Sequence, residues 1–462
     1  MISPNPSDIL SESGKPESHL FYQSRQRRPV LDRGCGVYLW DTDGKRYLDG
    51  SSGAMVSNIG HSNSYVLAAM KAQMDKATFG YRLHFETDVS EQLAKKTAAL
   101  MPEGLDSVFF VSGGSEAVES CLKFARQWAM VTSRADKWKI ISRFPSYHGS
   151  TLGALAITGM TPMTQPFAPM MREMPKVPAP TCYLDHDDLD HEQRGLRYAE
   201  LLKDEILQQG ADTVLAFIME PIGGASTGAL VAPDSYYRRV QAICKEFDVL
   251  LITDEVMTGG GRTGKFLSGD HWNLKPDLIA MSKGFAAGYA PLGAMIVRSD
   301  MVEKVLDAGG FNHGFTYAGN PLACAAGVAV LEEIENKQLI ERVQIQGGKL
   351  KQMLTDLMDK YRFIGDVRGK GLLLAFELMA DRTSKAPLPS SLNAYVRLVE
   401  IAYKNGLIIY SRRTRGGLEG DHFMVCPPFI ISDDEMRHLL ELLDKSLFEL
   451  ATEIGLSLGA KK

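Results

Sequence analysis

The sequence of 462 residues has no long hydrophobic run and no strong excess of either charge. Its longest small and apolar stretch, residues 322–331, is much shorter than the roughly 18 residues of a membrane span, so we expect no transmembrane helix. The formal net charge of -5 supplies no electrostatic attraction for nucleic acid or for an anionic membrane. We therefore expect neither as a partner.

Closely spaced cysteines are also missing. The six cysteines contain no C-x-x-C pair, which argues against a disulfide framework and against a zinc site, so no metal is expected. Residues 1–16 carry Pro, Ser, Asp and Glu without the apolar core of a signal peptide. These features predict a cytoplasmic protein with a loosely held N-terminal arm. The cysteines stand at positions 35, 121, 182, 244, 324 and 426.

Apolar strand patterns alternate with helix patterns from residue 86 to about residue 285. This alternation predicts an α/β fold with a doubly wound, mostly parallel sheet and crossover helices. We expect this large domain to cover residues 61–320. Its predicted strands are 107–111, 139–142, 214–219, 249–253 and 277–281, and its predicted helices include 64–75, 89–100, 116–130, 198–208 and 233–247.

Helix patterns dominate after residue 320, which predicts a smaller α+β domain over residues 321–462. An alternating β pattern at 36–49 surrounds Asp43-Gly44, a dipeptide typical of a tight hairpin turn. We expect the arm and hairpin of residues 1–60 to join the small domain. That domain's predicted helices are 321–335, 341–360, 392–405 and 433–454, with an extended run at 364–377 and a strand at 407–410.

Two charged side chains follow neighbouring strand patterns. Asp254 ends the apolar run 249–253, and Lys283 comes just after the run 277–281. Ligands of open α/β sheets bind in the crevice beyond the carboxyl ends of the strands, so we expect both groups to share one site. The alternative is a structural ion pair.

The turn Ser112-Gly113-Gly114-Ser115 ends one strand pattern and opens a helix. Free backbone N–H groups, two glycines and a serine hydroxyl at a helix N-terminus form a cradle suited to phosphate. The alternative is ordinary helix capping, with Ser115 as the N-cap and Glu116 in the first turn.

The segment 259–265, Gly-Gly-Gly-Arg-Thr-Gly-Lys, matches G-x-G-x-x-G and also the beginning of a P-loop. Its context argues against both nucleotide-binding interpretations, an NTPase and a dehydrogenase, which remain the alternative from another class. Phe266 stands where a P-loop needs Ser or Thr for magnesium, and Gly269 and Pro276 prevent the long helix that must follow. We interpret the segment as an active-site loop.

Two further loops are candidates for ligand contacts. Tyr147-His148-Gly149 follows a strand pattern, where an aromatic ring is either core or a stacking partner for a flat cofactor. Arg412, Arg413 and Arg415 form a predicted basic loop after the strand 407–410. Such a loop is either solvated surface or a source of an arginine for a substrate carboxylate.

One cofactor, pyridoxal 5′-phosphate (PLP), needs this whole combination. It requires a lysine for the Schiff base, an acid against the pyridine nitrogen, a cradle for the phosphate and an aromatic stack. A lysine must lose its proton before it attacks the aldehyde, and partial burial favours the neutral amine.

Over nearly its whole length the chain resembles the class III (ω-type) aminotransferases, which have the aspartate-aminotransferase fold (PLP-dependent fold type I). The resemblance implies that Lys283 binds the cofactor and shuttles the substrate proton, while Asp254 keeps the pyridine nitrogen protonated. The segments that carry it are 38–60, 111–123, 147–149, 220–221, 254–264, 282–284, 291–294 and 313–321.

The resemblance also implies the surroundings of the cofactor. Phosphate would be bound by Gly114 and Ser115, with Thr316 reaching across from a second subunit. The ring would lie between Tyr147 and Val256. His148 and Glu220 complete the expected set of cofactor contacts, with Glu220 on the side of the cofactor hydroxyl.

Substrate contacts are expected from Met55, from Phe79 and Tyr81 near positions lent by a partner subunit, from Tyr147, and from Arg413 or Arg415. Met55 stands where amine:pyruvate members of the family often carry tryptophan. The resemblance implies a homodimer with shared active sites, or a tetramer, that transfers an amino group from a primary amine or ω-amino acid to a small 2-keto acid, most simply pyruvate. An acceptor such as 2-oxoglutarate, or an aminomutase or dialkylglycine-type decarboxylase of the same fold, is the alternative.

Overall fold

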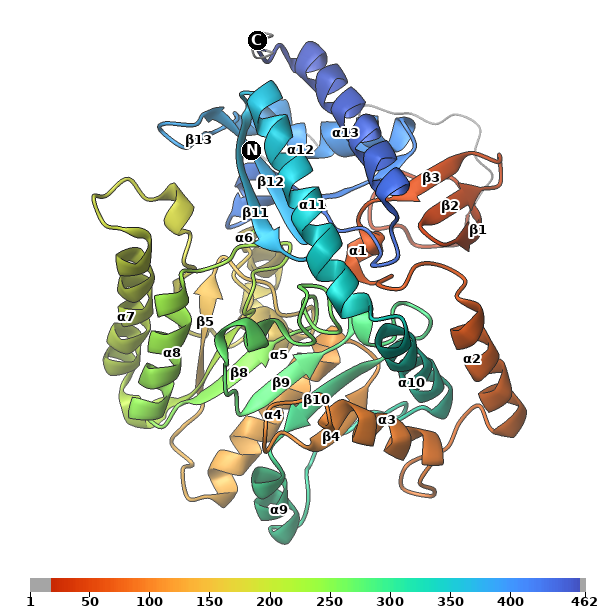
Figure 1. The fold of residues 1–462 in the computed structure, drawn as a ribbon. Helices are drawn as coiled ribbons and strands as arrows, with labels where there is room; N and C mark the ends of the chain where they lie inside the picture. The colour runs from red at the N-terminus through yellow and green to blue at the C-terminus, as the bar shows by residue number, and fades with distance from the viewer. Residues whose placement is uncertain (1–17, 458–462) are drawn as a thin grey trace.

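The computed structural model describes residues 18–457, so the predicted arm of residues 1–16 lies outside it. A seven-stranded sheet forms its centre, in the order β4-β10-β9-β8-β7-β5-β6 (Figure 1). Four neighbouring pairs are parallel, and β10 is antiparallel to both of its neighbours. The strands are β4 (Ser107–Val111), β5 (Lys139–Phe144), β6 (Lys176–Pro178), β7 (Val214–Met219), β8 (Leu250–Asp254), β9 (Leu278–Met281) and β10 (Gly293–Val297).

Helices cover both faces of this sheet, as a doubly wound fold requires. Along β7, Leu215 and Ile218 pack with α4 (Gly114–Val131), whereas Phe217 and Met219 pack with α7 (His191–Gln209) and α8 (Asp234–Glu246). Every residue of β7 is buried, because both faces of a parallel sheet are covered. The remaining helices of this part are α2 (Ser64–Lys76), α3 (Asp88–Ala98), α5 (Leu152–Ala156), α6 (Thr161–Thr164) and α9 (Ser299–Asp307), with a short α1 (Ser52–Met55) near the N-terminus.

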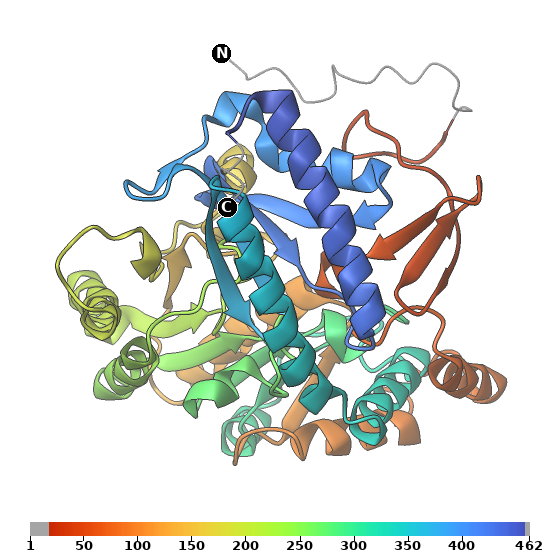
Figure 2. The same ribbon diagram turned by 45° about the horizontal axis from the view of Figure 1, so that its top comes forward.

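A second, antiparallel sheet lies in the C-terminal part, in the order β11-β12-β16-β15, with β13 paired to β12. Helices α11 and α13 contact each other over it, and Figure 2 shows them side by side. The strands are β11 (Ile364–Lys370), β12 (Leu373–Asp381), β13 (Ala386–Pro387), β15 (Tyr410–Arg415) and β16 (Glu419–Val425), and the helices are α10 (Pro321–Asn336), α11 (Leu339–Lys360), α12 (Ala394–Lys404) and α13 (Asp433–Ile454).

The N-terminal strands form a third sheet with a strand from the far end of the chain. Here β1 (Leu31–Cys35), β2 (Tyr38–Asp41) and β3 (Arg46–Asp49) are antiparallel, and β14 (Leu407–Ile408) pairs in parallel with β3. Gly44 adopts a φ of +80° in the turn between β2 and β3, as the sequence predicted. We propose 61–320 and 321–462 as the two domains, although the largest hydrophobic cluster runs continuously across residue 320.

Some sequence-based boundaries were wrong. Helix α4 begins at Gly114 with Gly113 as its N-cap, so the alternative role of Ser115 as N-cap is excluded. Helix α7 begins at His191, earlier than predicted, because Asp190 and Gln193 form a capping box. Strand β10 was not predicted as a strand. The predicted basic loop after residue 410 is instead strand β15, which pairs with β16.

No helix among residues 18–457 is long and apolar enough to cross a membrane. Within the same residues, no group of three or more His, Cys, Asp or Glu could hold a metal ion.

A buried polar network joins the C-terminal sheet to the loop after β7. Arg368 forms an ion pair with Glu377 at 2.8 Å and donates to the carbonyl of Thr227 at 2.9 Å. His422, which is completely buried, lies 3.0 Å from the Thr414 hydroxyl through Nδ1. Burial and the nearby charges of Arg368 and Arg412 lower the pKa of His422 to about 3.

This lowered pKa predicts a specific loss of stability in acid. The unfolded chain takes up a proton at its histidine near pH 6.5, whereas the folded protein keeps His422 neutral down to about pH 3. Stability should therefore fall as pH drops from 6.5 toward 3, by about 2 kcal/mol between pH 7 and pH 5 from this one group. Urea unfolding of wild-type protein and His422→Asn at both pH values measures the difference. The same pH dependence in both proteins would contradict the assignment.

Candidate active site

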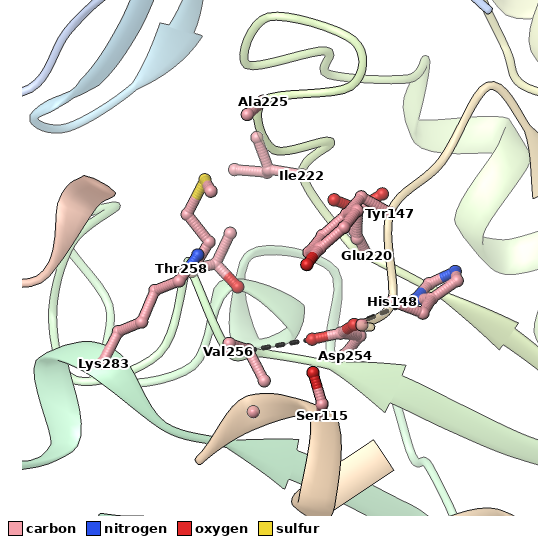
Figure 3. A pocket seen from close by; sticks show the side chains of 13 residues that line it. Ser115, Tyr147, His148, Glu220, Ile222, Ala225, Asp254, Val256, Thr258 and Lys283 are labelled. Carbon is pink, nitrogen blue, oxygen red and sulfur yellow. Dashed lines mark hydrogen bonds and ion pairs between the residues drawn. The ribbon is translucent and has the colours of Figure 1, made fainter. Parts of the chain in front are cut away.

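A pocket opens beyond the carboxyl ends of β7 and β8 and beside the segment that follows β9 (Figure 3). Predicted cofactor residues from five segments that are far apart in the sequence meet in this pocket. The lining residues are Gly114, Ser115, Tyr147, His148, Gly149, Glu220, Ile222, Ala225, Asp254, Val256, Met257, Thr258 and Lys283.

Asp254 is held rigidly at the floor of this pocket. It is 4% exposed, and its Oδ2 lies 2.8 Å from Nδ1 of the buried His148. Its Oδ1 accepts the backbone N–H of Val256 at 3.0 Å (Figure 3). A carboxylate fixed by two such contacts is oriented for a further hydrogen bond to a ring N–H, because each oxygen keeps a free lone pair.

Lys283 stands at the first position of a 3-10 turn, Lys283–Phe285, directly after β9 and Ser282. Its φ of +48° is unusual for a residue with a side chain, and such strain is concentrated at functional sites. Burial lowers the pKa of the Lys283 amine, against the opposing effect of the carboxylates of Asp254 and Glu220. The neutral, nucleophilic amine is therefore present at a lower pH than for an ordinary lysine.

The N-terminus of α4 forms the end of the pocket suited to an anion. The first intrahelical hydrogen bond runs from Ala117 N to Gly113 O, so the amides before Ala117 face outward. Ser115 Oγ accepts the Ser150 N–H at 3.0 Å, which leaves its own proton free to donate. A Cβ on Gly114 would lie 2.7 Å from the Val256 side chain, so only glycine fits there.

Glu220 follows β7 and is 6% exposed. Its Oε1 accepts the N–H of Gly224 at 2.9 Å, but its buried Oε2 has no hydrogen-bond partner within the described protein. Burial raises the pKa of this carboxyl group, against the charges of His148 and Arg143. An unpartnered oxygen of this kind is the place where a bound polar group would complete the hydrogen bonding.

The glycine-rich segment 259–265 is a structural junction. Arg262 is completely buried and donates to the carbonyls of Leu372, Cys426 and Pro427. It also reaches Ser52 Oγ at 3.1 Å. Its guanidinium thus joins the large domain to the C-terminal sheet and to the N-terminal segment, and the loop does not open a phosphate-binding helix.

Six predicted residues lie outside this pocket, and four of them are Met55, Phe79, Tyr81 and Thr316. Met55 is fully buried, with a φ of +57°, in an apolar cluster that also contains Ile222. Phe79, Tyr81 and Thr316 belong to surface segments, and the rings of Phe79 and Tyr317 are 5.9 Å apart. Their predicted roles across a subunit boundary stay predictions.

The three arginines of β15 differ in their partners. Arg413 is tied to Asp421 at 3.0 Å and to the carbonyl of Ser390 at 2.7 Å, and Arg415 donates to the carbonyl of Lys385 at 2.6 Å. Arg412 is exposed, and within residues 18–457 it has no acidic partner. None of the three arginines lines the pocket itself, and the substrate role of Arg413 or Arg415 stays a prediction.

Several pocket residues carried no recognisable signal in the sequence. Ile222, Ala225 and Met257 form an apolar wall, and Tyr410 packs against the same cluster. Burial raises the pKa of Tyr410, against the nearby charge of Arg412. The proximity of Ile222 to the Glu220-Pro221 motif was the one signal that could have identified it.

These observations fit PLP. The pocket offers an amine at Lys283, a fixed carboxylate at Asp254, an anion cradle at Gly114 and Ser115, and an unpartnered oxygen on Glu220. Tyr147 and Val256 both line it, as expected for residues on the two faces of a flat ring.

Comparisons with known proteins identify the family. The model of the class-III aminotransferases matches residues 22–447. An uncharacterized aminotransferase, YodT of Bacillus subtilis, is 38% identical over 91% of this chain and 95% of its own length. The putrescine–pyruvate aminotransferase of Pseudomonas aeruginosa is 31% identical over 92% of this chain and 91% of its own length.

Solved structures agree. The omega transaminase of Pseudomonas jessenii in complex with PMP has a TM-score of 0.87 and 29% identity, and covers 93% of this chain and 94% of that one. PMP is the aminated form of PLP, so the cofactor expected from the site and the cofactor of the family agree. The chain is a member of the class-III aminotransferases, enzymes that depend on pyridoxal 5′-phosphate.

Proposed function

We propose that this aminotransferase transfers an amino group from a primary amine or ω-amino acid to pyruvate. The observation that carries the proposal is the pairing of an apolar wall with one unpaired cation. Ile222, Ala225 and Met257 line the pocket, Tyr410 packs behind them, and Arg412 lies over the Tyr410 ring at 4.6 Å. The wall suits the apolar body of an amine, and the guanidinium suits a carboxylate.

The roles of the chain's own groups follow from their positions. Asp254, held by His148, would accept a hydrogen bond from the pyridine N–H and keep that proton in place. PLP supplies the electron sink that makes the proton on the substrate's amine carbon acidic. Lys283, once released by the incoming amine, is the basic group able to take that proton. Gly114 and Ser115 would hold the phosphate, and Glu220 would contact the hydroxyl side of the ring.

The number of available cations favours pyruvate over 2-oxoglutarate. Pyruvate has one carboxylate, and Arg412 is the one β15 arginine without a carboxylate or distant carbonyl partner in the described residues. A dicarboxylate acceptor would need a second free cation beside the pocket. The name of the Pseudomonas aeruginosa relative also pairs an amine donor with pyruvate.

Two proposals concern assembly and location. We propose a homodimer with shared active sites. Phe79 and Tyr317 lie beside each other, are 46% and 62% exposed, and do not line the pocket of their own subunit. A tetramer built from such dimers is the larger alternative. We propose a cytoplasmic location, supported by six cysteines that are all free thiols.

The proposed reaction has a spectroscopic test. An amine donor should bleach the absorbance band of the enzyme-bound PLP, and pyruvate should restore this band. The reason is that PLP would alternate between its aldehyde and amine forms. Lys283→Ala should lose at least roughly 10³-fold in turnover, since one group serves as both nucleophile and base. Normal turnover by Lys283→Ala would contradict its role.

The same experiment tests the alternative reactions. Restoration by 2-oxoglutarate and not by pyruvate would overturn the proposed acceptor. Release of carbon dioxide would identify a decarboxylase, and turnover without any separate keto acid would identify an aminomutase.

The proposal for Arg412 has a matched control. Arg412→Leu should raise the KM for pyruvate by roughly 10- to 100-fold and leave the KM for an uncharged amine unchanged, because a charge-assisted hydrogen bond is lost. Arg46 also lies over a tyrosine ring, that of Tyr38, at 4.6 Å but far from the pocket, so Arg46→Leu should change neither value. A raised KM for pyruvate in Arg413→Leu or Arg415→Leu, with an unchanged KM in Arg412→Leu, would instead support the arginines predicted from the sequence.

The pKa of Lys283 gives a pH prediction. Because burial lowers this pKa, the apoenzyme should take up PLP at a rate that rises with pH, with a midpoint below the 10.5 of an ordinary lysine. The Glu220 carboxylate raises the pKa of Lys283, so Glu220→Gln should move the midpoint to lower pH. Stopped-flow absorbance measures the rate. A midpoint that moves to higher pH in Glu220→Gln would contradict this coupling.

A further inference from the structure

The hairpin formed by β15 and β16 reaches from the C-terminal sheet to the large domain. Its turn, residues 416–418, packs against the segment that follows β5 and against the start of α6. The carbonyl of Gly416 accepts the N–H of Thr161 at 3.1 Å. A Cβ on Gly416 would lie 2.6 Å from the Phe144 ring, and one on Gly417 would lie 3.0 Å from Met160. The turn is therefore in close contact with a platform made by Phe144, Met160 and Thr161.

This platform is directly connected to the cofactor residues. Ser146 and Gly159 form an antiparallel bridge, with Gly159 N donating to Ser146 O at 2.9 Å. The N–H of His148 donates to the Thr158 hydroxyl at 3.0 Å. The segment that receives the turn is thus bound to the segment that carries Tyr147 and His148.

The other end of β15 lies beside the same pocket. Tyr410 packs against the apolar cluster that includes Met257. Arg412 Cζ lies 4.6 Å from the Tyr410 ring, and Arg412 is opposite His422 in the β15–β16 pairing. Both ends of β15 are therefore held by contacts. The turn after β15 packs on Phe144, and Tyr410 at the start of β15 packs on the apolar wall of the pocket.

We propose that docking of the 416–418 turn on Phe144 and Thr161 positions Tyr410 and Arg412 beside the pocket, and thereby sets the affinity for the carboxylate-bearing substrate. Neither the turn nor Phe144 lines the pocket, so Gly416 and Phe144 are positioning residues. The inference rests on the proposed role of Arg412. It goes beyond that role because it assigns specificity to a contact between the two domains at a distance from the chemistry.

Gly416 and Gly44 provide a matched pair of variants. Both glycines occupy hairpin turns with positive φ, +64° and +80°, but a Cβ on Gly44 would meet no atom within 4 Å. Gly416→Val and Gly44→Val therefore impose similar backbone strain, and only Gly416→Val forces the turn from its platform. Phe144→Ala removes the platform from the other side.

The first measurement is independent of activity. Hydrogen exchange of the holoenzyme should be faster at the Thr161 amide in Gly416→Val than in wild-type protein, because that amide loses its acceptor. Gly44→Val should exchange at Thr161 as the wild type does. Unchanged exchange in Gly416→Val would overturn the docking.

The second measurement is steady-state kinetics. The KM for pyruvate should rise about tenfold in Gly416→Val and in Phe144→Ala, equivalent to about 1.4 kcal/mol. The double variant should match either single variant, because both changes break one contact. An unchanged KM despite fast exchange at Thr161, or a rise equal to that in Gly44→Val, would overturn the inference. Failure of the proposed acceptor is separate, because wild-type protein would then show no turnover with pyruvate.

Discussion

The parallel pairing of β8 with β9 is the constraint on which the active site depends. Asp254 lies opposite Ala280 in this register, so Lys283 follows its strand three residues past the partner of Asp254. Both strands are fully buried, and a slip of one residue would place every side chain in a space shaped for another. The acid and the amine are thus presented at one sheet edge by the rigid centre of the molecule, with no need for a flexible loop.

A long segment connects these two strands, and the contacts of Arg262 fix its position. A buried guanidinium would be costly without partners, but its two terminal nitrogens make five hydrogen bonds to oxygens of three distant segments. Burial lowers its pKa to about 10, so Arg262 remains charged at neutral pH. The G-x-G-x-x-G pattern therefore serves packing: Gly260, Gly261 and Gly264 all have positive φ, which lets the backbone turn around this one side chain.

The charged groups in the pocket and the aromatic and basic side chains beside it come from different parts of the chain. The large domain supplies the charged groups that face the cofactor, and they come from strand ends. The C-terminal sheet supplies Tyr410 and Arg412, and its buried Arg368 contacts the loop that carries Ala225 through the carbonyl of Thr227.

The sequence by itself determined the residues whose chemistry is local. A buried strand followed by Asp254, a strand followed by Lys283, and a strand-to-helix turn at Gly114 are each readable because strand ends share one sheet edge. Only the tertiary structure distinguishes the three arginines by their partners, since Arg413 and Arg415 donate to carbonyls that lie 23 and 30 residues away in the sequence. It also decided that this basic segment is a strand, because β pairing with β16 overrode its polar, glycine-flanked composition. Contacts across long sequence separations have no local pattern, so the sequence could not predict these partners.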